Sequence, residues 1–276
     1  MDGMQLPAAA ALTARYGAGA EPKLGPWNDT MALLLSHRSV RGYRPDALPA
    51  GTLESLIAAA QSAATSSNLQ TWSVVSVNDP EKRRALAAIA GGQKHIEQCP
   101  IFLVFIADVS RNERLGEQEG AALAGMPFLE TFLVAAIDAG LAAQNAVVAL
   151  ESLGLGSVYI GALRNQPEKV AAELGLPKLV FPAFGLSIGV PDPKGASGIK
   201  PRLPQSVVVH REQYDPTLDP ATIAAYDSRM SAFQTEQRMP DERWTQRVIQ
   251  RVKTPASLSG RHRMKEALAN LGFELK

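Results

Sequence analysis

Two cations stand close together in a stretch made rigid by proline, and this pair is the first feature of the sequence that could do chemistry. Lys200 and Arg202 alternate with Pro201, and Pro204 follows. Proline fixes its own φ and pushes the preceding residue toward extended geometry. In an extended chain, side chains at positions i and i+2 project to the same side. We therefore expect Lys200 and Arg202 to form a preformed, two-pronged site for an anion.

Three further polar clusters carry groups that suit phosphates, hydroxyls or flat rings. They are the basic run HRSVR (37–41), the hydroxyl-rich TSSNLQ (65–70) and the glycine-containing GGQKH (91–95). Loop hydroxyls can donate hydrogen bonds to phosphate or ribityl oxygens. Glycines allow the backbone to approach a flat ligand closely. Each cluster taken alone is more often a solvated turn or a helix cap, so the argument depends on their occurring together.

The whole-chain composition makes any anion site a local feature. Among 276 residues, 28 Lys and Arg oppose 27 Asp and Glu, which leaves a net charge of +1. Such a balance does not favour binding to nucleic acid or to an anionic membrane. Cys99 is the only cysteine, so the chain can form neither an internal disulfide nor a cysteine-cluster metal site, and we expect no metal. A single cysteine is consistent with a cytoplasmic protein.

The elements that must position these residues alternate between helix and strand, which indicates an α+β or α/β fold. The run IFLVFIAD (101–108) is continuously apolar, as is typical of a buried central strand. The segment 127–153 is apolar nearly all round, and we expect one long helix that is buried in the core or at a subunit interface. Further strands are expected at 72–77, 157–162, 182–190 and 206–210. Two further helices are expected to begin after N-caps, one among Asn28, Asp29 and Thr30 and one at Thr52. Other helices are expected over 79–92 and 165–175 and in the tail from 219 to 273.

The ends of the chain differ in character from the middle. Residues 1–25 are rich in Ala, Gly and Pro and lack the basic start of a signal peptide, so we expect a flexible arm. Residues 26–276 then form one domain, in which 219–276 are a helical excursion. No continuous apolar run reaches the roughly 18 residues of a membrane span, and no membrane association is expected.

A competing motif points to a different class of enzyme. The stretch GLSIG (185–189) matches G-x-S-x-G and would make Ser187 a hydrolase nucleophile. That role requires a sharp turn from strand to helix after the serine. The strand-like pattern instead continues to Val190, and Pro191 and Pro193 follow. A strand that happens to contain a serine is the better interpretation.

Taken together and in order, HRSVR, TSSNLQ, GGQKH, GLGSVYIGALRN and KPRLP resemble the FMN-dependent nitroreductase superfamily. The resemblance spans roughly residues 28–250 and is strongest to the branch of oxygen-insensitive NADPH nitroreductases and NADPH-flavin oxidoreductases. It implies a three-layer α-β-α sandwich with a mixed, mainly antiparallel central sheet. It also implies an interlocked homodimer that binds FMN at the interface between the subunits.

The resemblance assigns a role to each cluster. It implies that HRSVR holds the phosphate, the ribityl chain and part of the ring, that the serine loop lies beside the flavin, and that KPRLP clamps the phosphate. It also implies that one glutamine faces the ring system and that a backbone stretch lies near the ring edge. The residues concerned are His37, Arg38, Ser39, Arg41, Thr65, Ser66, Ser67, Gln93, Tyr159, Ile160, Gly161, Lys200 and Arg202, with Arg238 as the candidate for the NADPH 2′-phosphate.

The activity implied by the resemblance is a two-electron, ping-pong hydride transfer. NADPH is the implied electron donor, with NADH as the alternative, and a nitroaromatic, a quinone or a similar small molecule is the acceptor. Because the cofactor carries this chemistry, the sequence needs no catalytic acid or base, and we nominate none. The alternatives are a flavin reductase that supplies reduced FMN to a partner monooxygenase and, from another class, a hydrolase that uses Ser187.

Overall fold

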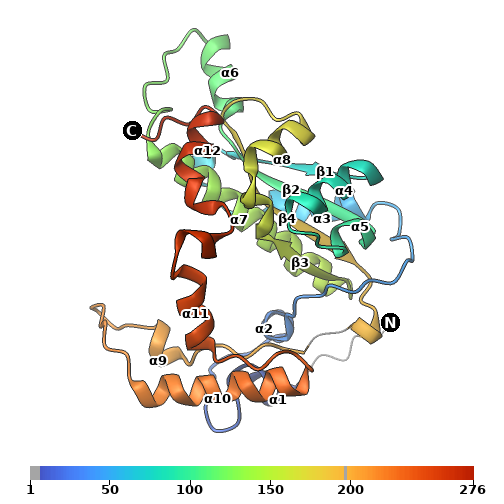
Figure 1. Cartoon of the computed structure of the whole chain (residues 1–276), viewed down its shortest axis with the longest axis vertical. Helices are drawn as coiled ribbons and strands as arrows, with labels where there is room; N and C mark the ends of the chain where they lie inside the picture. The colour runs from blue at the N-terminus through green and yellow to red at the C-terminus, as the bar shows by residue number, and fades with distance from the viewer. Residues whose placement is uncertain (1–6, 196–197) are drawn as a thin grey trace. The chain divides into compact units, whose positions relative to one another are not determined.

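The computed structural model of the chain describes residues 7–195 and 198–276, in two compact units. We call them the helical unit, which comprises Met1–Arg38 and Ser197–Ser257, and the sheet unit, which comprises Ser39–Ala196 and Leu258–Lys276. Figure 1 shows the elements of both units in chain order. Residues 1–6 of the expected arm lie outside the described residues.

The sheet unit is built on four antiparallel strands. They are β1 (Trp72–Ser76), β2 (Ile101–Asp108), β3 (Gly156–Ile160) and β4 (Val180–Gly189), in the order β1-β2-β4-β3. Strand β2 pairs with β1 on one side and β4 on the other, which explains its uninterrupted apolar sequence. A parallel contact occurs only as a single bridge between Ser39 and Ser157 within the described residues. The expected mainly antiparallel sheet is confirmed.

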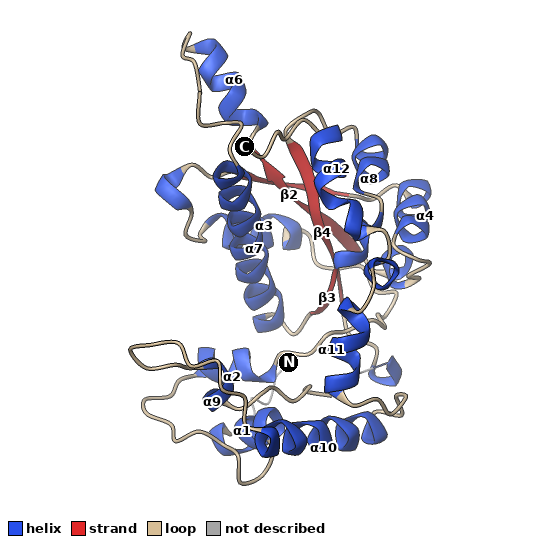
Figure 2. Ribbon diagram, turned by 60° about the vertical axis from the view of Figure 1, so that its left-hand side comes forward, coloured by secondary structure: helices blue, strands red, loops and turns tan. Residues whose placement is uncertain are grey.

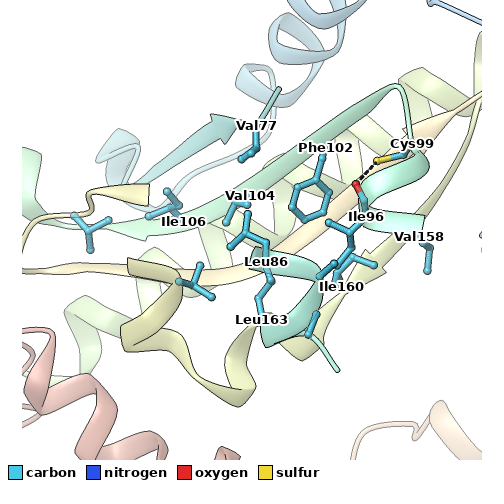
Figure 3. Packing of buried hydrophobic residues seen from close by; sticks show 14 residues of the cluster. Val77, Leu86, Ile96, Cys99, Phe102, Val104, Ile106, Val158, Ile160 and Leu163 are labelled. Atoms are coloured by element: carbon cyan, nitrogen blue, oxygen red, sulfur yellow. Dashed lines mark hydrogen bonds between the residues drawn. The ribbon is translucent and has the colours of Figure 1, made fainter. Parts of the chain in front are cut away.

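Helices cover both faces of this sheet, so the expected three-layer sandwich is also confirmed. Figure 2 shows α3 (Thr52–Gln61) and α7 (Leu129–Ser152) on one face, and α4 (Pro80–Ile89), α8 (Pro167–Leu174) and α12 (Met264–Asn270) on the other. On the α4 side, Leu86, Phe102 and Leu163 belong to a buried apolar cluster (Figure 3). The short helices α5 (His95–Gln98) and α6 (Ser110–Gln118) complete the unit; neither had been predicted as a separate element.

Helix α7 is the long apolar helix that the sequence predicts. Its alanine-rich face packs with Leu56 of α3 and with Phe105 and Ile188 of the sheet. By length and composition alone α7 could cross a membrane, but 44% of its most apolar stretch is buried inside the protein. We therefore describe it as a core helix. An apolar stripe of residues spaced by four remains exposed along it, namely Leu129, Leu133, Ile137 and Leu141.

Local signals account for several helix ends. Asn28 caps α2 (Asp29–Ser36), because its side chain accepts a hydrogen bond from the Met31 N–H at 3.0 Å. Gly154 follows α7 with a φ of 75°, as expected of a glycine that ends a helix. The expected cap at Thr52 was wrong. Gly51 occupies the cap position, and the Thr52 hydroxyl instead donates to the Pro49 carbonyl.

The helical unit contains α1 (Ala8–Tyr16), α2, α9 (Gln205–Val208), α10 (Pro220–Glu236) and α11 (Trp244–Val252). Tyr226, Met230 and Phe233 of α10 form its apolar core. Two sequence predictions fail here. Residues 8–16, expected to be part of a flexible arm, form helix α1, because an alanine-rich stretch has high helix propensity and buries Leu12. The expected strand 206–210 overlaps α9, a single helical turn that follows Pro204.

Candidate functional site

The Lys200–Arg202 pair is fixed by hydrogen bonds within the helical unit. Arg202 Nη1 donates to the Lys200 carbonyl oxygen at 3.2 Å, and the Tyr226 hydroxyl donates to the Pro201 carbonyl oxygen at 3.0 Å. Burial raises the pKa of Tyr226, although the positive charges of Arg202 and Arg229 oppose the shift, so Tyr226 remains a protonated donor. Lys200 and Arg202 themselves are exposed. Both residues line the same cavity, and a joint role in binding an anion stays a prediction.

These two cations line a cavity of about 490 Å³ in the same unit. The described lining holds a third cation, Arg247, and no carboxylate. Such a set of groups suits an anion with an attached flat ring, because guanidinium groups bind phosphate oxygens and aromatic walls pack against rings. Arg238, the sequence candidate for a second phosphate, is not in the described lining. The other lining residues are Tyr16, Leu203, Val208, Tyr226, Met230, Gln234, Met239 and Trp244.

The HRSVR run spans the boundary between the units. His37 and Arg38 belong to the helical unit, whereas Ser39 and Arg41 belong to the sheet unit. In the sheet unit, the Val40 N–H donates to the Ser157 carbonyl oxygen of β3 at 2.8 Å. The run is thus attached to the β3 edge of the sheet.

Tyr43 attaches the segment after the HRSVR run to β4. Its buried hydroxyl donates to the Val40 carbonyl oxygen at 2.7 Å and lies 3.0 Å from the Ser187 carbonyl oxygen. Burial raises the pKa of this hydroxyl. Tyr43 therefore stays protonated at neutral pH and holds Val40 over the sheet.

The glycine-containing loop lies within electrostatic reach of Arg41. Gly91 and Gly92 adopt φ values of 81° and 78°, a conformation that other residues rarely adopt. The Gln93 side chain donates to the Ala90 carbonyl oxygen at 2.9 Å. Burial, and secondly the positive charge of Arg41, lowers the pKa of His95. The Nε2 atom of His95 is buried and has no hydrogen-bond partner among the described residues.

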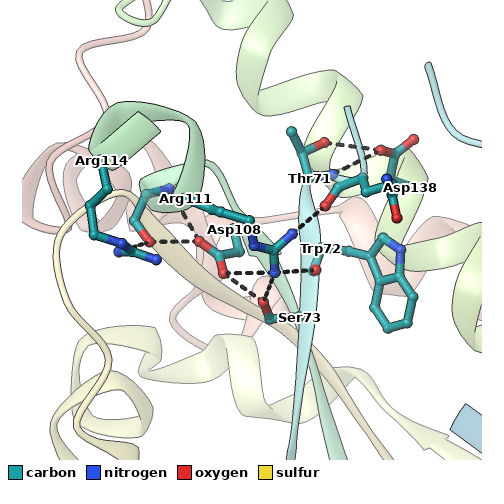
Figure 4. A network of polar contacts seen from close by, with 9 residues as sticks. Thr71, Trp72, Ser73, Asp108, Arg111, Arg114 and Asp138 are labelled. Atoms are coloured by element: carbon teal, nitrogen blue, oxygen red, sulfur yellow. Dashed lines mark hydrogen bonds and ion pairs between the residues drawn. The ribbon is translucent and has the colours of Figure 1, made fainter. Parts of the chain in front are cut away.

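The hydroxyl-rich loop holds an unusual backbone conformation over a buried carboxylate. Ser67, Asn68 and Gln70 have φ values of 48°, 54° and 52°, and left-handed non-glycine residues of this kind gather at functional sites. Asp138 of α7 is 1% exposed and accepts hydrogen bonds from the Ser66 N–H and from the N–H and hydroxyl of Thr71 (Figure 4). Thr65 precedes this loop and is partly buried.

The candidate residues Tyr159, Ile160 and Gly161 lie at the end of β3 and the start of the turn that follows it. Tyr159 is 37% exposed and packs edge-on against Phe184, with the ring centroids 5.3 Å apart. Ile160 is buried beneath it. At Gly161, an added Cβ would lie 3.2 Å from the Arg164 side chain, so a larger residue would crowd that arginine.

Comparisons with known proteins agree with this geometry. Residues 34–190 match the Nitroreductase family, and residues 200–276 match the Nitroreductase family, C-terminal domain. The chain belongs to the nitroreductase family. It is 39% identical over 231 residues to an FMN reductase (NADPH) of Bacillus subtilis, covering 82% of this chain and 92% of that protein.

Two further relatives support the assignment. This nitroreductase is 41% identical over 204 residues to an oxygen-insensitive NADPH nitroreductase of Salmonella typhimurium, covering 74% of this chain and 82% of that protein. It also superposes on the structure of the NADPH:FMN oxidoreductase from Vibrio harveyi complexed with NAD+. That superposition has a TM-score of 0.81 and 35% identity, and it covers 90% of this chain and 100% of the other.

The donor set of this nitroreductase fits FMN. In the helical unit, Lys200, Arg202 and Arg247 supply cations beside aromatic side chains. In the sheet unit, the buried and unpartnered Nε2 of His95 lies beside a glycine-containing loop. The hydrolase alternative fails, because Ser187 is fully buried within β4, two residues before the strand ends, and not on a turn from strand to helix.

Sequence reasoning missed three residues that support the site. Asp138 carries a signal in hindsight, since it is the charged residue within the apolar middle of α7. Tyr226 and Arg15 carry no local signal. Their contacts join segments far apart in the chain, so only the folded structure reveals them.

Proposed function

We propose that this nitroreductase is an FMN-dependent NAD(P)H oxidoreductase that reduces nitroaromatics, quinones or similar small acceptors by two-electron, ping-pong hydride transfer. The observation that carries the proposal is the cationic, aromatic-walled cavity that contains Lys200 and Arg202. The relatives described as FMN reductase (NADPH) and oxygen-insensitive NADPH nitroreductase support it. Within this class, NADPH is the expected donor.

Different residues of this chain are proposed to bind different parts of the cofactor. Lys200, Arg202 and Arg41 neutralise the phosphate, and the hydroxyls of Ser39 and Ser66 donate to the sugar-alcohol chain. Gln93 offers its amide to the ring edge. Bound FMN supplies the hydride chemistry itself. Positive charge near the ring favours the negative charge that the ring gains on reduction. The remaining binding residues of the proposal are His37, Arg38, Thr65, Ser67, Tyr159, Ile160 and Gly161.

The 2′-phosphate of NADPH requires a cation other than Lys200 and Arg202. Arg238 is the sequence candidate, and it is exposed directly after α10. Arg247 is a second candidate, because it lines the cavity together with Arg202 and Trp244, although it also pairs with Glu242 at 2.8 Å.

A homodimer completes the proposal. Leu129, Leu133, Ile137 and Leu141 present an exposed apolar stripe along α7, and a second copy of the chain is its proposed occupant. Continuous apolar surface of this kind marks interfaces in soluble proteins. We place the dimer in the cytoplasm, where the buried thiol of Cys99 stays reduced.

A second candidate function uses the same cofactor but has a different product, free reduced FMN. One relative is described as an FMN reductase, which supports as the alternative a source of reduced FMN for a partner monooxygenase. Weakly held FMN and fast turnover of added FMN distinguish this function. Tightly held FMN with turnover of nitroaromatics or quinones supports the first.

The visible absorption spectrum of the purified protein, recorded before and after anaerobic addition of NADPH, tests the proposal. We expect a flavin spectrum that bleaches when NADPH is added. A protein that stays colourless after incubation with FMN contradicts the proposal. A flavin spectrum that NADPH and NADH both leave unchanged contradicts the reductase activity while retaining the cofactor.

A further inference from the structure

Helix α1 lies outside the segments that match the family. Those segments begin at residues 34 and 200, whereas α1 spans Ala8–Tyr16. The helix nevertheless contributes to the cationic cavity, because Tyr16 is part of its lining. A helix outside the matched segments thus borders the cationic cavity of the helical unit.

Arg15 connects α1 to two of the predicted phosphate-binding motifs. Its Nη1 donates to the Lys200 carbonyl oxygen at 2.7 Å. Its Nη2 donates to the carbonyl oxygens of Leu35 at 2.6 Å and His37 at 2.8 Å. The residue is 6% exposed, so these bonds are shielded from water and from competing donors. One planar guanidinium therefore joins the start of HRSVR to the start of KPRLP.

The connection runs in both directions. The Arg202 N–H donates to the Arg15 carbonyl oxygen at 2.9 Å, while Arg202 Nη1 shares the Lys200 carbonyl oxygen with Arg15. The backbone and side chain of Arg15 thus both contact the segment 200–202. Because Arg15 and Lys200 are 185 positions apart in sequence, folding alone brings them together.

We infer that Arg15 is a positioning residue for the phosphate clamp, an inference that rests on the proposed function. It holds the backbone carbonyl groups of Lys200 and His37 in place, so that the backbone from which these two side chains project needs no ordering when the phosphate binds. Binding groups that are ordered in advance give higher affinity, because the entropy cost of ordering them is not incurred at binding. Lysine offers an ammonium with three donors but not the planar fork, so it replaces arginine only in part.

The affinity of the apoprotein for FMN, followed by quenching of flavin fluorescence, is the first measurement. We expect Arg15→Met to weaken binding about tenfold, which corresponds to losing roughly one buried hydrogen bond's contribution. Arg15→Lys should give an intermediate Kd. With FMN at saturation, the Arg15→Met enzyme should recover most of the wild-type kcat, because Arg15 acts on the phosphate-binding segment and not on the reacting ring.

Leu12→Ala is the matched control. Leu12 is a buried residue of the same helix, and its truncation weakens the packing of α1 without removing the guanidinium. We expect it to lower the free energy of unfolding and to leave the Kd for FMN within about twofold of wild type. If the Kd of Leu12→Ala and Arg15→Met rise together in proportion to lost stability, Arg15 is only structural and the inference is overturned.

The proposed function and the role of Arg15 are overturned by different outcomes. Wild-type apoprotein that does not bind FMN overturns the proposed function. Wild type that binds FMN, with the same Kd in Arg15→Met, overturns only the role of Arg15. Should Arg15→Met not fold, Arg15→Lys decides the question, because a Kd equal to wild type in that variant excludes a requirement for the planar fork.

Discussion

Val40 occupies the space that a side chain at residue 156 would need. A Cβ added to Gly156 would lie 2.6 Å from Val40 Cγ2, far inside van der Waals contact. Val40 is 1% exposed and bonds through its N–H to Ser157. The glycine at the start of β3 is therefore what allows the HRSVR run to lie directly against the sheet.

Gly156→Ala should displace the HRSVR run from β3. We expect a loss of about 1–3 kcal/mol in the free energy of unfolding, as for other overpacked cores, and weaker FMN binding. Val40→Ala removes Cγ2, the nearest atom to the added Cβ, although Val40 Cβ at 2.8 Å remains, so the relief is partial. The double variant should then be more stable than the sum of the single losses predicts, and strict additivity in urea denaturation would contradict the contact.

Asp138→Asn should loosen the serine loop. Asparagine keeps one acceptor oxygen and replaces the other by an NH2 group, which cannot accept a hydrogen bond. That NH2 group would therefore face an N–H or hydroxyl donor that bonds to Asp138 in the wild type. We expect a loss of about 1–3 kcal/mol in the free energy of unfolding together with weaker FMN binding. Asp108→Asn is the control, since Asp108 is also buried and accepts from Ser73 and Ser110 (Figure 4). Equal effects of both variants on FMN affinity would contradict a specific role for Asp138.

Arg202→Ala should separate cofactor binding from folding. The side chain is exposed, so we expect the free energy of unfolding to change by less than about 0.5 kcal/mol, while the Kd for FMN rises at least about tenfold. Arg44→Ala is the control, because Arg44 is an exposed arginine that pairs with Asp46 at 2.7 Å. Equal losses of stability and FMN affinity in Arg202→Ala would count against the clamp.

His95 should make the apoprotein less stable as the pH falls. Burial and the charge of Arg41 lower its pKa in the folded state, so near and below the ordinary value of about 6.5 the unfolded chain binds the proton more readily. The free energy of unfolding contributed by this group is therefore complete at higher pH and is lost as the pH falls through that range.

The pH effect is measured as the difference in unfolding free energy between pH 7.5 and pH 5.5. In His95→Gln this difference should shrink, and Arg41→Gln should reduce it partly. His262→Gln, a change at an exposed histidine, should leave it as in wild type. An unaltered pH profile in His95→Gln would show that other groups dominate.

Ile137→Lys should dissociate the proposed homodimer. Ile137 is 60% exposed at the centre of the α7 stripe, and a buried lysine without a partner is strongly unfavourable at an interface. Sedimentation should report a monomer for this variant and a dimer for wild type. Leu115→Lys, on α6, is the control, because it adds the same charge to the surface outside the stripe, and it should remain dimeric. A dimer in both variants would exclude the α7 stripe as the dimer interface.

Local sequence determined much of this protein. Strands β1 to β4, the long helix α7 and the Asn28 cap follow from periodicity and capping, which act over a few residues. The order of the polar clusters was sufficient for the resemblance to the family.

Tertiary structure decided the remainder, because the interactions concerned join distant segments. The bonds from Arg15 to Lys200 and from Thr71 to Asp138 leave no pattern in their neighbouring residues. The burial of Ser187 was set by the strands on either side of β4, which no short motif encodes. Helix α1 had enough propensity to form, yet only burial of its apolar face and of Arg15 makes it part of a folded unit.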